Sequence, residues 1–222
     1  KPFMSNIVVV YHSGYGHTQR MAQSVAQGAG AQLLAIDADG NLPEGGWAQL
    51  AAAEAIVFGA PTYMGAPSWQ FKKFADASSK PWFAQTWKDK LFAGFTNSAG
   101  VQGDKQVTLD YFYHLAMQHS GIWVGLGMLP SNTKAAQRND ANWMGAYSGA
   151  MAQTPSDASV AEMLPGDLET ARQMDQIERH LRLAGLSAER AEFTRLGRAR
   201  LLDEETAKRL IREVDLQELR YL

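Results

Sequence analysis

The feature that most constrains this fold is a short loop with the sequence Ser13-Gly14-Tyr15-Gly16-His17-Thr18. Before it stands Ile7-Val8-Val9-Val10-Tyr11, an apolar, β-branched run typical of a strand buried on both faces of a parallel sheet. After it, residues 18–29 have the pattern of a helix. Glycines let backbone N–H groups approach a ligand closely, and the N-terminus of a helix favours an anion. We therefore predict a phosphate-binding loop between a strand and a helix, with the hydroxyls of Ser13 and Thr18 as further donors.

The rest of the first 125 residues alternates between short apolar runs and helical patterns. This alternation is typical of βαβ units and predicts an α/β fold with a parallel sheet. The predicted strands cover residues 7–11, 33–36, 55–59, 91–96 and 122–125. The predicted helices cover residues 18–29, 48–53, 67–79 and 105–120, with Pro67 in a first turn.

The C-terminal part of the chain has a different character. Residues 127–165 show no clear periodicity, and Lys, Arg, Asp and Glu make up 19 of the last 47 residues. Asp203 is suited to cap a helix whose apolar stripe is formed by Ala207, Leu210, Ile211 and Val214. We predict one domain over residues 4–175 and a charged helical extension over residues 176–222.

Composition excludes several classes of function. The chain has no cysteine, so thiol catalysis, disulfides and cysteine-ligated metals are excluded, and we expect no metal site. A net charge of −2 argues against a nucleic-acid-binding protein. No apolar run approaches the roughly 18 residues of a membrane span, and the N-terminus lacks a signal-peptide pattern. We therefore expect a cytoplasmic protein with no membrane span.

Two more loops follow predicted strands and have the chemistry of a binding site. We call residues 13–18 loop one, residues 61–65 loop two and residues 97–103 loop three. Loop two is Pro61-Thr62-Tyr63-Met64-Gly65, in which Tyr63 or Met64 is suited to cover a ring face. Loop three is Asn97-Ser98-Ala99-Gly100-Val101-Gln102-Gly103, whose backbone N–H groups are suited to the edge of a flat heterocycle. In an open α/β sheet these loops face one ligand crevice.

Other interpretations of loop one remain open at this point. The loop is not a Walker P-loop, because no Gly-Lys-Ser/Thr follows. Gly14 and Gly16 fit the first two glycines of the dinucleotide fingerprint, but Gln19 stands where the third belongs. Asp37 lies near the spacing expected of a ribose-binding acid, so a Rossmann-type dinucleotide site is an alternative. An ordinary strand-to-helix turn is another.

The three loops, with Gln118-His119-Ser120-Gly121 and Asn142-Trp143-Met144-Gly145-Ala146-Tyr147, resemble the flavodoxin-like NAD(P)H:quinone oxidoreductases of the tryptophan-repressor-binding-protein type. The resemblance covers about residues 4–174. It implies a flavodoxin-like three-layer α/β sandwich whose five parallel strands have the order 2-1-3-4-5. It also implies bound FMN, NADH or NADPH as electron donor, a quinone as substrate, and assembly into a dimer or tetramer.

Carried over to this chain, the resemblance implies a role for each loop. Loop one would hold the FMN phosphate, loop two would contact the ring system, and loop three up to Gln102 would line the other ring edge. Tyr15 and Trp82 would border the substrate, and His119 would lie at the flavin as the catalytic proton donor. Loop three is less glycine-rich than is usual in the family, and Gln118-His119 stands where two histidines are common.

The predicted activity is two-electron transfer from NAD(P)H to quinones by a ping-pong mechanism. One alternative is a one-electron carrier of the flavodoxin type. Another is a flavin-gated sensor or assembly module that acts through the charged tail and a partner of its helices. Residues 203–218 also weakly resemble the cytoplasmic C-terminal helices of bacterial monovalent cation/proton antiporters.

Overall fold

The computed structural model describes residues 6–160 and 185–218. The chain divides into two compact units, and these two ranges fall one in each. The predicted domain boundary at residues 175 and 176 lies outside the described residues.

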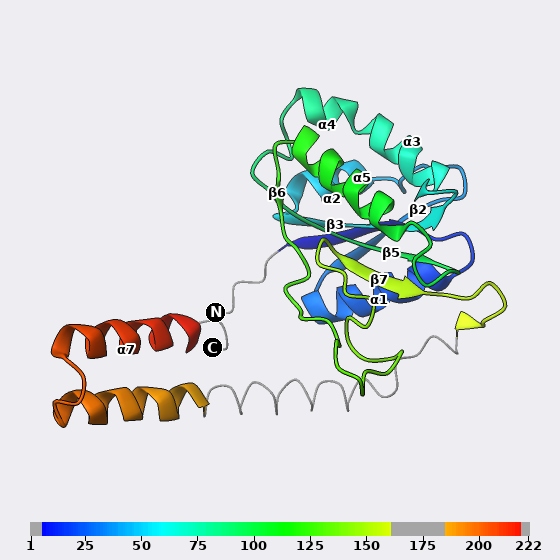
Figure 1. The fold of residues 1–222 in the computed structure, drawn as a ribbon. Coiled ribbons are helices and arrows are strands. Elements are labelled where there is room, and N and C mark those ends of the chain that lie inside the picture. The colour runs from blue at the N-terminus through cyan, green and yellow to red at the C-terminus, as the bar shows by residue number, and fades with distance from the viewer. Residues whose placement is uncertain (1–5, 161–184, 219–222) are drawn as a thin grey trace. The chain divides into compact units, whose positions relative to one another are not determined.

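The first unit is built on a sheet whose main path has the order β2-β1-β3-β5-β6, with all neighbours on this path parallel (Figure 1). The strands are β1 (Ile7–His12), β2 (Gln32–Ile36), β3 (Ala55–Tyr63), β5 (Leu91–Ser98) and β6 (Ile122–Trp123). These are the five predicted strands, and counted along the chain their order is 2-1-3-4-5. The flavodoxin-like α/β class is therefore confirmed.

Two short strands were not predicted and enlarge the sheet to seven strands. The strand β4 (Ala66–Pro67) runs antiparallel to the end of β3, and β7 (Ala150–Gln153) runs parallel to the second half of β5. The strand β3 pairs with one side of β5. The other side of β5 is shared by two short strands: β6 pairs with Leu91 and Phe92, and β7 pairs with residues 95–98. The predicted strand 122–125 is thus too long. Residues 124–149 separate β6 from β7, which both lie beside β5 at the fifth strand position of the sheet.

The helices of this unit are α1 (His17–Ala29), α2 (Gly46–Ala52), α3 (Trp69–Ala77), α4 (Ser79–Phe83) and α5 (Lys105–Gln118). The helix predicted from Pro67 begins only after Ser68, because Pro67 pairs with Thr62 in the sheet. It also divides at Ser78 into α3 and α4. None of the helices in the described ranges has both the length and the apolar character needed to cross a membrane.

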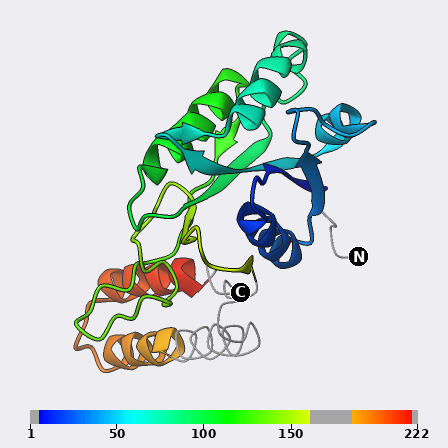
Figure 2. The ribbon, with the colours of Figure 1, turned by 90° about the vertical axis from the view of Figure 1, so that its right-hand side faces the viewer.

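Helices cover both faces of the sheet (Figure 2). On one face, Phe58 packs between α3 and α5 with ring contacts to Phe71, Phe92 and Phe112. On the other face, α1 packs its small buried residues against Val9, Tyr11 and Phe95. Because helices cover both faces, the loops at the carboxyl ends of the strands are the part of the sheet left open to a ligand, as expected for an α/β sheet.

The second unit contains helical residues 185–198 and α7 (Glu204–Glu218). Asp203 accepts the Thr206 N–H at 2.9 Å, which confirms the predicted helix cap. Ala207 and Val214 of the predicted stripe are buried. Arg190 joins the two helices through an ion pair with Asp215 (Nε to Oδ1, 2.9 Å). The charged helical extension is thus a pair of helices over its described residues.

Candidate functional site

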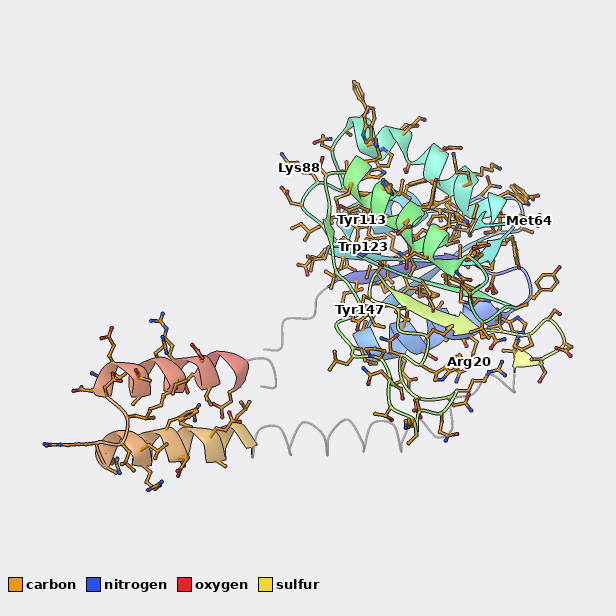
Figure 3. The ribbon with its side chains drawn as sticks, viewed as in Figure 1. Arg20, Met64, Lys88, Tyr113, Trp123 and Tyr147 are labelled. Atoms are coloured by element: carbon orange, nitrogen blue, oxygen red, sulfur yellow. The ribbon has the colours of Figure 1, made fainter. Side chains whose placement is uncertain are left out.

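Loops one, two and three meet at the carboxyl edge of three adjacent parallel strands, β1, β3 and β5. The rings of Tyr15 and Tyr63 lie edge to face with centroids 6.3 Å apart. A Cβ atom on Gly14 would lie 2.8 Å from the Tyr63 hydroxyl oxygen, so loops one and two are packed against each other there. Figure 3 places Met64 at this edge. The structure thus brings together the loops that the sequence singled out.

Loop one presents a set of free donors. Gly16 has φ +87° and precedes α1, whose first helical hydrogen bond runs from the Arg20 N–H to the Gly16 carbonyl at 3.0 Å. The N–H groups of residues 17–19 therefore have no helical acceptor. The Gly16 N–H donates to Ser13 Oγ at 3.1 Å, which leaves the Ser13 hydroxyl proton available. Several N–H donors, one hydroxyl and a helix N-terminus fit a phosphate monoester.

Three side chains that were predicted to bind the cofactor, those of His17, Thr18 and Asn97, are buried beneath the loops instead of exposed among them. The buried Thr18 hydroxyl donates to Asn97 Oδ1 at 2.6 Å, and Asn97 Nδ2 donates to Thr154 Oγ1 at 2.9 Å. The ring of His17 is hydrogen-bonded to the Ala158 carbonyl through Nε2 at 3.0 Å. In this structure the Thr18 hydroxyl donates its proton to Asn97, so a contact of that hydroxyl with a phosphate stays a prediction. These side chains hold loop one against β5 and the segment that follows β7.

Loop two divides in the same way. Pro61 and Thr62 are buried, and the Thr62 hydroxyl lies 2.8 Å from that of Thr96 and 2.7 Å from that of Thr108. Tyr63 and the fully exposed Met64 point out, and Gly65 completes the turn with φ +74°. Tyr63 and Met64 are therefore the side chains of this loop that are exposed for contact with a ligand.

Beside loop two runs an open groove that the sequence analysis did not predict. Its most exposed aromatic side chain is Trp69, the first residue of α3. The signal available in the sequence was its position two residues after Pro67, in the first turn following a binding-type loop. The groove is lined by Tyr63, Met64, Ala66, Pro67, Ser68, Trp69, Lys72, Lys73 and Asp76.

Loop three lies largely exposed from Ser98 to Gln102. It is anchored from β7, where Gln153 Nε2 donates to the Ala99 carbonyl at 3.0 Å. The buried Lys105, which sequence analysis treated only as the start of a helix, lies behind the same loop. Loop three therefore exposes its backbone, and the side chains of Gln153 and Lys105 hold that backbone in place through hydrogen bonds to its carbonyl groups.

Asp37 does not serve a nucleotide in this structure. Its Oδ1 accepts the N–H of Asn41 at 2.7 Å and that of Asp39 at 2.9 Å. The hydrogen bond from Asn41, followed by that from Asp39, holds the pKa of the Asp37 carboxyl below its usual value. The carboxylate thus closes a local turn, and the observed strand order is not that of a Rossmann fold, so the dinucleotide interpretation is wrong.

His119 and Trp82 lie at the amino ends of the strands, whereas the three loops lie at the carboxyl ends. The helix α5 starts after loop three and runs back antiparallel to β5, so its C-terminal cap His119 reaches the amino end of that strand. There the Asp89 N–H donates to the Ser120 carbonyl at 3.0 Å, and Ser78, which precedes α4 and Trp82, is hydrogen-bonded to His119. Figure 3 shows Lys88 at this end and Met64 at the other. Within one chain, His119 and Trp82 therefore lie away from the three loops, and a role for them at the flavin stays a prediction.

His119 is instead a buried, neutral core residue. The Ser78 hydroxyl donates to the Ala75 carbonyl at 2.6 Å, so it accepts from His119 Nε2–H at 2.9 Å. Among the described residues, His119 Nδ1 has no partner, and the ring lies 4.2 Å from that of Trp87. Burial lowers the pKa of His119 to about 4.

This environment predicts an acid-sensitive fold. The unfolded chain binds a proton on this histidine near pH 6.5, whereas the folded chain binds it only near pH 4. Stability is therefore full above pH 6.5 and is lost as the pH falls toward 4, by on the order of 3 kcal/mol. Urea unfolding between pH 7 and pH 4.5 should show this slope, and His119→Gln should reduce it. Burial also lowers the pKa of His12, so His12 should account for part of the pH dependence that is left in the His119→Gln variant. The exposed His114 of the same helix is the control, and an equal effect of His114→Gln would contradict the assignment.

Comparison with known proteins shows the family of the chain. The family model of NADPH-dependent FMN reductases matches residues 46–134. The chain is 57% identical over 169 residues to a protein named flavodoxin FldP from Pseudomonas aeruginosa, covering 76% of this chain and 92% of that protein. It is 33% identical over 192 residues to an NAD(P)H dehydrogenase (quinone) from Geotalea uraniireducens, covering 75% of this chain and 92% of the relative.

A solved structure supports the same assignment. The flavodoxin, WrbA-like protein from Agrobacterium tumefaciens is 60% identical, with a TM-score of 0.61 over 76% of this chain and 90% of that one. None of these relatives is an antiporter, so the resemblance of residues 203–218 to antiporter tails stays without support. The chain belongs to the flavodoxin-like family of FMN-dependent NAD(P)H:quinone oxidoreductases.

Proposed function

We propose that this protein is an FMN-dependent oxidoreductase that transfers two electrons from NADH or NADPH to quinones by a ping-pong mechanism. The observation that carries the proposal is the meeting of three loops at one sheet edge, with the free donors of loop one beside the exposed Tyr63 and Met64. FMN supplies the chemistry when bound, because it accepts a hydride from the nicotinamide and delivers two electrons to a quinone. The protein supplies binding, orientation and electrostatics.

The residues at this edge would divide the work of holding FMN. The Ser13 hydroxyl and the free N–H groups of residues 17–19 would bind the phosphate. Tyr63 and Met64 would cover part of a ring face, and the backbone of loop three would bind the polar ring edge. The buried Thr18–Asn97 hydrogen bond would keep the phosphate loop and the ring-binding loop at a fixed separation.

The substrates would use the open side of the same edge. Tyr15 is 78% exposed, and the groove along loop two adds the exposed ring of Trp69 and the ammonium group of Lys72, which is ion-paired with Asp76 in this structure and would have to exchange that partner for a ligand anion. Aromatic rings with a nearby cation suit a nicotinamide dinucleotide, which is flat at one end and anionic in the middle. A nicotinamide and a quinone would occupy this space in turn, since each must stack on the flavin to exchange electrons with it.

Assembly into a dimer or tetramer is part of this proposal. At the amino edge of the sheet, Trp82 and Phe83 are exposed and available to a neighbouring copy. His119, by contrast, is buried in its own chain, so we do not propose it as a proton donor to another copy. The cytoplasmic location and a partner for the second unit remain predictions.

Steady-state kinetics test the proposed mechanism. If NAD(P)H and quinone use one pocket in turn, double-reciprocal plots at several fixed quinone concentrations should be parallel. NAD(P)H at high concentration should inhibit competitively against the quinone, because it then occupies the quinone's place. Intersecting lines would contradict the shared pocket, since they require both substrates to be bound together.

A one-electron carrier is the second candidate, and the name of the 57% identical flavodoxin relative favours it. A carrier should accept electrons in two separate one-electron steps. A stepwise reductive titration of the FMN-loaded protein, with two well-separated potentials, would support the carrier over the reductase.

A further inference from the structure

We propose that Lys105 is a positioning residue of the flavin site, whose buried ammonium group shapes loop three into a donor surface and favours reduced, anionic FMN over oxidised FMN. The proposal rests on the FMN site described above and not on the identity of the electron donor or acceptor. It assigns a task to a lysine whose side chain is fully buried at the first turn of α5.

The ammonium of Lys105 is surrounded by oxygen atoms of loop three. Its Nζ donates to the Gly100 carbonyl at 2.7 Å, the Val101 carbonyl at 2.7 Å and Ser98 Oγ at 3.0 Å. These three acceptors use all three of its protons. Among the described residues, no carboxylate pairs with it, so its positive charge is solvated by neutral dipoles and is not cancelled. Burial lowers the pKa of Lys105, and the three acceptors favour the protonated form.

The hydrogen bonds from Lys105 to these carbonyls fix the direction in which the N–H groups of loop three point. A trans peptide directs its C=O and N–H to opposite sides, and the described chain contains no cis peptide. The carbonyls of Gly100 and Val101 face Lys105, so the N–H groups of Val101 and Gln102 face away from it. Gln153 holds the Ala99 carbonyl in the same way, which turns the Gly100 N–H outward. No hydrogen bond of these three N–H groups occurs within the described residues.

The loop closes over the ammonium only because of a glycine. Gly103 has φ +51°, and a Cβ atom there would lie 2.0 Å from Ser98 Oγ, one of the three acceptors of Lys105. The close approach of Gly103 to Ser98 allows residues 98–103 to wrap around one side chain. The lysine and the glycine are therefore parts of one arrangement.

A row of outward N–H groups above a buried cation is suited to a polar acceptor that gains negative charge. Successive backbone N–H groups form concave anion sites in other proteins, and a buried charge acts through a lower dielectric than an exposed one. Reduced FMN at neutral pH carries its extra negative charge on the polar edge of its ring system. Loop three would therefore bind reduced FMN more tightly than oxidised FMN, which raises the potential of the two-electron couple.

Two substitutions at Lys105 separate loop shape from charge. Lys105→Met removes both the donors and the charge, whereas Lys105→Gln keeps two N–H donors for the loop carbonyls without the charge. Lys90→Met is the matched control, since Lys90 also donates to backbone carbonyls, those of Ala51 (2.6 Å) and Ala53, but lies directly before β5 at the opposite sheet edge. Each variant is loaded with FMN, and the FMN dissociation constant and the midpoint potential are measured with a chemical reductant and a reference dye.

We expect Lys105→Met to weaken binding of oxidised FMN about tenfold and of reduced FMN about 100-fold, which lowers the two-electron potential by about 30 mV. Lys105→Gln should lower the potential similarly while oxidised FMN binds within about threefold of wild type. Lys90→Met should leave both quantities unchanged. If Lys105→Met does not fold, Lys105→Gln decides the question alone.

Wild-type potentials in both Lys105 variants, or an equal shift in Lys90→Met, would overturn the proposal. Neither NAD(P)H nor quinone enters these measurements. A chain that shows the predicted potential shift but reduces no quinone would therefore contradict the proposed function while leaving the role of Lys105 intact.

Discussion

Replacing Gly16 by alanine should weaken FMN binding at least about 100-fold, because two to three charge-assisted hydrogen bonds at about 1.5–3 kcal/mol each depend on this residue. Its φ of +87° costs any residue with a Cβ atom about 1–2 kcal/mol. The added Cβ would also lie 3.0 Å from Val160 Cγ2. Relief of this strain turns the peptides of loop one and misdirects the free N–H groups of residues 17–19. Titration of the apoprotein with FMN, followed by flavin fluorescence, measures the loss.

Gly30→Ala is the matched control for this substitution. Gly30 ends the same helix, has φ +62°, and has open space around the added Cβ. Both variants should lose free energy of unfolding in urea, since both place alanine in a left-handed conformation, and Gly16→Ala should lose at least as much because its Cβ also meets Val160. Only Gly16→Ala should lose FMN, and equal FMN affinities in the two variants would show that loop one is not the phosphate site.

Asn97→Ala should lower the free energy of unfolding by about 3 kcal/mol and weaken FMN binding about tenfold or more. Asn97 is buried and joins the Thr18 hydroxyl of loop one to the Thr154 hydroxyl that follows β7. Its removal leaves both hydroxyls buried without this partner and frees loop one to shift relative to loop three. Urea unfolding and FMN titration of the same variant measure the two effects.

A double-mutant cycle shows whether the two losses come from the Thr18–Asn97 hydrogen bond. Thr18→Val removes the hydroxyl with little change of shape, and alone it should cost about 1–2 kcal/mol. If the hydrogen bond is the cause, the double variant should be less destabilised than the sum of the single variants, by about 1 kcal/mol. Additive losses would mean that Asn97 acts through packing alone.

The sequence predicted the strands that are long or β-branched and missed those that depend on a partner. The β-branched run that begins at Ile7 and the segment that begins at Ala55 can be recognised from side chains alone. The residues of β7, Ala150-Met151-Ala152-Gln153, carry no strand pattern and form a strand because the open edge of β5 accepts them. The same holds for β4, where a proline was expected to start a helix. Pairing between distant segments is not visible in local propensity.

The candidate site was predictable as a set of loops but not as a set of side chains. The carboxyl ends of parallel strands must share an edge, so loops one to three were expected to meet, and they do. Which way Thr18, Thr62 and Asn97 point depends on buried partners that lie 34 to 79 positions away in the sequence. The position of His119 within the chain could not be predicted from its motif, because it depends on topology: α5 starts after loop three, so its C-terminal end lies at the amino ends of the strands.

Anaerobic titration of the FMN-loaded protein with NADPH or NADH, followed by addition of a quinone, tests whether the protein is a two-electron quinone reductase. One equivalent of the nicotinamide should bleach the flavin absorbance in a single two-electron step. One equivalent of quinone should then restore the absorbance fully, without the intermediate spectrum of a one-electron species. A protein that takes up no FMN, or whose bound flavin is not reduced by either nicotinamide, would not be an FMN-dependent NAD(P)H:quinone oxidoreductase.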